Sequence, residues 1–119
     1  YLAAFDVVIE PVVKSFAPDL IIIAAGFDAA DGDPLGGMMV SPTGYMHMTK
    51  RLIEIGTGRV VVALEGGYAL RPLATCATAT LRALLGDEPS LYHRGLDRGN
   101  QASSSVASSR RCSQSTGPC

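Results

Sequence analysis

The sequence is short of the residues that would mark several functional classes. It has no tryptophan, two histidines and three cysteines in 119 residues, and a net charge of −1. That charge gives no basic footprint for nucleic acid. No apolar run reaches the roughly 18 residues that a transmembrane helix needs. The cysteines form no CxxC pair, so neither a zinc ribbon nor a disulfide scaffold is indicated. We therefore expect neither nucleic acid nor membrane as a direct partner.

The apolar residues are unevenly distributed along the chain. Nearly all apolar periodicity lies before Gly86, which predicts one domain at residues 1–91. Residues 92–119 are rich in serine and predict a disordered tail. The start lacks the basic character of a signal peptide, and it also lacks an initiator methionine. We therefore expect a fragment of a longer protein.

The most informative stretch is 20–34, LIIIAAGFDAADGDP. Its apolar half predicts a strand at 20–25 that is buried on both faces. Asp28 follows the end of this strand, where α/β proteins bind ligands. It is a candidate metal ligand or catalytic acid, or else an aspartate that caps its own turn. We expect Asp31 and Asp33 to be solvated or turn-forming.

Helices and a second strand flank this stretch. An amphipathic helix is predicted at 1–16 from Phe5, Val8, Val12 and Phe16, with a kink or restart at Pro11. Ser41-Pro42 predicts a helix start, and RVVVAL at 59–64 predicts a second buried strand. A last helix is predicted by Leu73, Ala77, Leu81 and Leu84, ending at Gly86.

A strand–helix–strand unit of this length predicts parallel strands with a right-handed crossover. The turns after the two strands then leave the sheet at the same edge. If the strands pair directly, Asp28 and Tyr68 can face one pocket. Tyr68 is a candidate phenol donor to a reacting group, or a tyrosine that packs on the turn formed by Gly66 and Gly67. That turn also allows a weaker hypothesis, a nucleotide site.

For the remaining residues of interest we expect structural or surface positions without a chemical role. We expect Cys76 to fill the core and Met38 and Met39 to pack beneath the loop. His47 is expected at the surface or partly packed, and His93 at the surface. Glu65 is a buried acid or a cap of its turn.

Three segments together resemble a known family. AGFDAADGDPLGG (25–37), SPTGY (41–45) and LEGGY (64–68) resemble the C-terminal part of the zinc-dependent histone deacetylases, in particular their class II branch. Acetylpolyamine deacetylases and acetoin-utilisation proteins are more distant relatives. The resemblance implies an α/β fold: part of a three-layer, open parallel sheet of the arginase/deacetylase type, with two core strands and three helices.

The resemblance also implies residue roles. Asp28 matches one of three zinc ligands, and Tyr68 matches the tyrosine that stabilises the transition state. Leu35 matches a residue that lines the acyl-lysine channel, and Gly66 and Gly67 match the backbone beside it. Leucine at that channel position favours acetyl-lysine over polyamine substrates, because polyamine-preferring relatives carry an acid there. The implied cofactor is Zn²⁺, which lowers the pKa of a bound water.

The sequence also departs from the family. It contains no Asp-x-His pair and no His-His pair, which supply the other ligands and the base. A catalytic zinc site needs three protein ligands. Ala69 stands where asparagine is common, and the serine-rich tail matches nothing in the family. We therefore expect the C-terminal third of a deacetylase domain that is inactive by itself. The alternatives are a non-catalytic interaction fragment and a fragment of an acetylpolyamine deacetylase. The resemblance implies an acetyl-lysine protein substrate, a corepressor complex, and a location in the nucleus, the cytoplasm or both.

Overall fold

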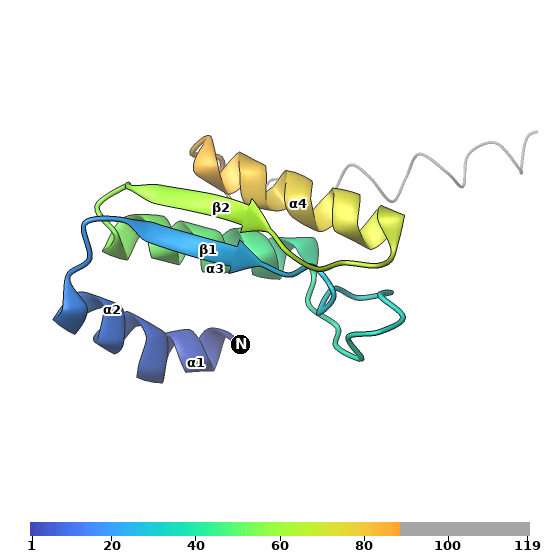
Figure 1. The fold of residues 1–119 in the computed structure, drawn as a ribbon, viewed down its shortest axis with the longest axis horizontal. Helices are drawn as coiled ribbons and strands as arrows, with labels where there is room; N and C mark the ends of the chain where they lie inside the picture. The colour runs from blue at the N-terminus through green and yellow to red at the C-terminus, as the bar shows by residue number, and fades with distance from the viewer. Residues whose placement is uncertain (89–119) are drawn as a thin grey trace, which may run out of the picture. The chain divides into compact units, whose positions relative to one another are not determined.

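The computed structural model describes residues 1–88; the predicted tail and His93 lie outside them. The elements follow one another as α1 (Leu2–Ala4), η1 (Phe5–Ile9), α2 (Glu10–Phe16), β1 (Ile21–Ala25), α3 (Pro42–Ile55), β2 (Val60–Leu64) and α4 (Leu70–Leu84). The first three form one continuous helical segment. The predicted α/β class, with two strands and three helices, is confirmed (Figure 1). No helix in residues 1–88 has the length and apolarity to cross a membrane.

The two strands are parallel neighbours. Their register runs from Ile21 opposite Val60 to Ala25 opposite Leu64. Both arrows in Figure 1 point the same way, and the turns that follow them leave the sheet at one edge. The predicted parallel pairing, with α3 between the two strands in the chain, is confirmed. This arrangement brings residues 40 positions apart in sequence to the same edge.

The described residues cover only one face of the sheet. Ile23, Ala25 and Val62 pack into a core with residues of α3 and α4. On the opposite face, Ile22 is 67% exposed and Val61 is 50% exposed. The prediction that both strands are buried on two faces is therefore wrong for this chain, since no described element packs against the second face.

The N-terminal helical segment changes its winding just before Pro11. Glu10 donates its backbone N–H to the carbonyl of Phe5, five residues back, and α2 begins at Glu10. Because proline has no N–H and its ring crowds the preceding turn, a widened π turn is a natural solution. The prediction that Pro11 disturbs the helix is confirmed as a change of winding, and the helical segment continues without a break. The predicted apolar face is not buried, however: Phe5 is covered, whereas Val12 and Phe16 are exposed.

Helix α3 begins as its sequence predicts, and α4 packs differently from expectation. The Ser41 hydroxyl accepts the N–H of Gly44 at 3.1 Å, which caps α3. In α4 the buried residues are small: Cys76, Ala79, Thr80 and Ala83. Leu81, predicted to face the core, is 59% exposed. Small side chains let α4 approach Met46 of α3 closely, and they take the place predicted for Leu81. Leu73 and Ala77 pack against the core, as predicted.

Cys76 fills the core, as predicted. It is 1% exposed, and burial raises the pKa of its thiol to about 11. The thiol therefore stays protonated at neutral pH, which makes it a poor nucleophile.

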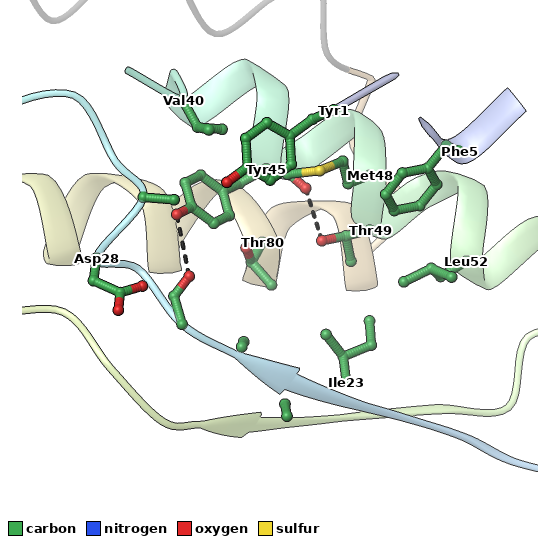
Figure 2. A pocket seen from close by; sticks show the side chains of 14 residues that line it. Tyr1, Phe5, Ile23, Asp28, Val40, Tyr45, Met48, Thr49, Leu52 and Thr80 are labelled. Carbon is green, nitrogen blue, oxygen red and sulfur yellow. Dashed lines mark hydrogen bonds between the residues drawn. The ribbon is translucent and has the colours of Figure 1, made fainter. Parts of the chain in front are cut away.

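A cavity of about 290 Å³ lies between the N-terminal helical segment, β1 and α3. Figure 2 shows Phe5, Ile23 and Leu52 around it, with Asp28 at one end. The Thr80 hydroxyl also lines the cavity, and this buried oxygen has no hydrogen-bond partner in the described part of the chain. An unpaired buried hydroxyl costs about 1–3 kcal/mol of stability.

Candidate functional site

The candidate site is built where the turns after β1 and β2 meet. Backbone pairing continues past the strands: Glu65 donates its N–H to the carbonyl of Ala25 at 3.0 Å, and Phe27 donates to the carbonyl of Gly66 at 2.7 Å. This extension holds Gly66 beside the backbone that carries Asp28. The two turns therefore form one structural unit at the carboxyl edge of the sheet.

Asp28 lies in a space that two glycines leave open. A Cβ atom at Gly26 would lie 2.9 Å from one Asp28 carboxylate oxygen, and a Cβ at Gly66 would lie 3.2 Å from the other. The carboxylate is partly exposed. Because a side chain at either glycine would crowd the carboxylate, the glycines allow the backbone to approach this acid from both sides.

Phe27 and Tyr45 fix the turn that presents Asp28. Phe27 is 3% exposed, and its ring centroid lies 5.1 Å from that of Tyr45. The Tyr45 hydroxyl donates a hydrogen bond to the carbonyl of Gly26 at 3.1 Å, as Figure 2 shows. Burial raises the pKa of Tyr45 to about 12, so the phenol keeps its proton and remains a donor. This bond joins residues 19 positions apart, and no local pattern in the sequence indicates it.

The loop between Asp28 and α3 is closed by a short bridge and folds back on Asp28. Val40 donates to the carbonyl of Ala29 at 2.9 Å, which joins the two ends of the loop. A Cβ at Gly36 would lie only 1.7 Å from the backbone oxygen of Asp28. Such contact distances do not occur, so only glycine allows the loop to pass here.

Three side chains of this loop point outward. Leu35 is 70% exposed, Met38 is 46% exposed and Met39 is 80% exposed. The prediction that the two methionines pack beneath the loop is therefore wrong. The backbone of the loop, at Gly36, already occupies the space against Asp28.

Asp33 differs most from expectation, because it is 9% exposed and joins both turns. Its Oδ1 accepts the N–H groups of Leu35 at 2.9 Å and Gly36 at 3.3 Å. Its Oδ2 accepts those of Tyr68 at 2.7 Å and Ala69 at 3.2 Å. The turn-forming role is confirmed and the solvated one is wrong. A local turn of this kind can be predicted from Asp-Pro-Leu-Gly, but the bonds to Tyr68 and Ala69 cannot.

Tyr68 follows a turn that requires glycine. Gly67 has a φ of 136°, and a Cβ there would lie 2.8 Å from Leu73 and 3.1 Å from Phe27. The Tyr68 backbone is held by Asp33, while its side chain is 61% exposed. The structure thus brings the turns of Asp28 and Tyr68 together. His47 is exposed, which confirms its surface position, whereas the prediction of Glu65 as a buried acid is wrong because this side chain is also exposed.

The described residues do not form a complete metal site. Within residues 1–88 there is no group of three His, Cys, Asp or Glu side chains that could hold a metal ion. The glycine-flanked Asp28 is suited to act as one ligand, since its carboxylate is partly exposed and no side chain at Gly26 or Gly66 crowds it. The other ligands that a catalytic zinc requires have no counterpart among these residues.

The fold and this edge of the sheet define an α/β chain of the arginase/deacetylase type, and the comparisons name its family. The histone deacetylase domain family matches residues 1–84. The chain belongs to the histone deacetylase family. The crystal structure of the HDA15 HD domain superposes with a TM-score of 0.72 at 49% identity, over 73% of this chain and 25% of that one. The structure of the histone deacetylase Clr3 gives a TM-score of 0.74 at 44% identity, over 78% and 16%.

The curated relatives are much longer than the matched segment. Histone deacetylase 15 of Arabidopsis thaliana is 49% identical over 89 residues, which cover 75% of this chain and 16% of that protein. Histone deacetylase 9 of Homo sapiens is 46% identical over 90 residues, which cover 74% and 9%. The chain therefore spans less than a fifth of the length of these relatives.

Proposed function

We propose that residues 1–91 form the C-terminal portion of a zinc-dependent protein lysine deacetylase domain. The observation that carries the proposal is the pairing of two turns at one sheet edge. One turn presents the glycine-flanked carboxylate of Asp28, and the other presents Tyr68. Because the chain belongs to the histone deacetylase family, we assign these two side chains the roles of a zinc ligand and an oxyanion donor.

In this proposal each residue has a separate task. Asp28 supplies one zinc ligand, and the Tyr68 hydroxyl donates a hydrogen bond to the oxyanion that develops on the acetyl carbonyl. Such a donor contributes about 3 kcal/mol to transition-state stabilisation. Leu35, Gly66 and Gly67 line the path of the acyl-lysine chain. Zinc, when bound by a complete domain, activates water and polarises the carbonyl; the remaining ligands and the base come from outside residues 1–88.

The proposed substrate is an acetylated protein, histone or non-histone. We place the complete protein in the nucleus, the cytoplasm or both, with a corepressor complex as its setting and transcriptional repression as its effect. Leu35 supports a lysine rather than a polyamine substrate, because an apolar side chain offers no charge to a polyamine. The support for these points is the family and the loop sequence.

A chimera tests the proposal. In the catalytic domain of Arabidopsis histone deacetylase 15, the segment that matches residues 1–88 is replaced by the whole 119-residue chain. We expect the zinc-loaded chimera to hydrolyse an acetyl-lysine peptide within about tenfold of the unmodified domain, since half of the matched residues differ but the site turns are kept. The 119-residue chain alone should show no turnover. A folded, zinc-loaded chimera without activity, or turnover by the chain alone, would contradict the proposal.

A second candidate is a non-catalytic interaction fragment. It is favoured by the uncovered apolar side chains of Ile22 and Val61 on the sheet and of Phe16 on α2. Exposed apolar surface of this kind promotes association with other chains. The chimera separates the two candidates: a folded but inactive chimera favours the interaction fragment, whereas an active one favours the deacetylase portion.

A further inference from the structure

We propose that Asp33 is the positioning residue for Tyr68, and that it sets the place of the phenol by holding the backbone of the turn that carries it. This inference rests on the proposed function, because it assigns a purpose to the site already described. Asp33 does not itself touch the reacting atoms in this account. It acts through the tyrosine.

The two carboxylate oxygens of Asp33 accept hydrogen bonds from two different turns. Oδ1 accepts N–H groups from residues 35 and 36 of its own loop, and Oδ2 accepts those of Tyr68 and Ala69, 35 and 36 positions away. One side chain therefore ties the turn after β1 to the turn after β2. Hydrogen bonds to an ionised carboxylate are about twice as strong as neutral ones.

The turn that carries Tyr68 needs these hydrogen bonds to restrain its backbone. Two glycines precede the tyrosine, and glycine leaves the backbone more conformational freedom than any other residue. The Tyr68 side chain is 61% exposed, so packing of the ring supplies little restraint. The position of the phenol is therefore set mainly by the backbone amides of residues 68 and 69, which Asp33 holds.

Asp33 is charged in this arrangement. Its burial alone would raise the pKa of the carboxyl, but the four backbone N–H groups outweigh burial, and the pKa lies below its ordinary value. At neutral pH both oxygens are acceptors, as four N–H donors require. Asparagine has the same shape but replaces one acceptor by an N–H₂ group, which faces N–H donors. Asp33→Asn is therefore the sharpest variant.

The first experiment measures the tie itself in the 119-residue chain, without any activity. Amide hydrogen exchange is followed residue by residue by NMR in Asp33→Asn and in the control Asp31→Asn, whose side chain is exposed. We expect exchange at Tyr68 and Ala69 to become at least about tenfold faster in Asp33→Asn. The β1–β2 amides and the control should not change. Unchanged exchange at Tyr68 and Ala69 would overturn the proposal.

The second experiment asks whether the tie matters through Tyr68. In the active chimera, Asp33→Asn should lower kcat about 100-fold with little change in KM, as misplacement of a catalytic group does. In a Tyr68→Phe background the same change should cost less than about twofold, because groups that act as one unit are not additive. Equal losses in both backgrounds would show a merely structural role and overturn the positioning role. An inactive parent chimera counts against the proposed function, and the exchange rates then decide the tie alone.

Discussion

Replacing Tyr68 with phenylalanine is expected to lower the kcat of the chimeric deacetylase by about 100- to 1,000-fold, the usual effect of removing one oxyanion donor. KM should change little, because the hydroxyl is lost from the transition state rather than from substrate binding. The measurement is steady-state turnover of an acetyl-lysine peptide at fixed zinc.

Tyr1→Phe is the matched control. It removes the hydroxyl of another exposed tyrosine, which lines the cavity beside Tyr45 but belongs to neither turn. The control should retain full turnover. If Tyr68→Phe were as active as this control, the phenol would have no part in the chemistry, and the assignment of the second turn would be wrong.

Gly36→Ala is expected to have the largest effect on stability. A Cβ there would lie 1.7 Å from the oxygen and 2.5 Å from the carbonyl carbon of Asp28, so the backbone itself must move. We expect the free energy of unfolding of the 119-residue chain to fall by about 3 kcal/mol, the upper range for overpacking. Urea denaturation measures it, and the chimera carrying the same change should lose activity because Asp28 is displaced.

Gly37→Ala separates this clash from a general loss of loop glycine. Gly37 has a φ of 60°, and no atom lies within 4 Å of a Cβ placed there. Its only penalty is the left-handed backbone, about 1–2 kcal/mol for a residue with a Cβ. Equal losses for the two alanine variants would mean that the loop does not pass against Asp28 as the structure shows.

The features that could be predicted from sequence are those with local causes. The parallel strands follow from two apolar runs joined by a helix, and the start of α3 follows from a serine cap before proline. The position of Asp28 at the carboxyl edge follows from the end of its strand. The family resemblance rested on the same turns, and the comparisons confirm it.

The features that escaped prediction depend on contacts between distant segments. A continuous apolar run predicts burial on both faces but does not reveal which segment covers the second one, and among the described residues Ile22 and Val61 are exposed. Helical periodicity places Leu73, Ala77 and Leu81 on the inner face of α4, and this holds for the first two. At Leu81 it is wrong, because close packing against Met46 of α3 favours small residues. The tie from Asp33 to Tyr68 spans 35 positions and leaves no local signal.

A designed disulfide tests most directly the central claim that the turns of Asp28 and Tyr68 form one site. The native cysteines are replaced, and cysteines are placed at Asp28 and Gly66 of the 119-residue chain. A Cβ at Gly66 would lie 3.4 Å from the Cγ of Asp28. In Asp28→Cys the sulfur takes the place of this Cγ, so the separation is close to that of a disulfide. The control pair joins Asp28 to Gly58, which precedes β2 at the far end of a strand about 16 Å long. We predict that mild oxidation closes the 28–66 disulfide within the monomer and leaves the control pair open. Failure of the 28–66 pair to close, or equal closure of both pairs, would contradict the account.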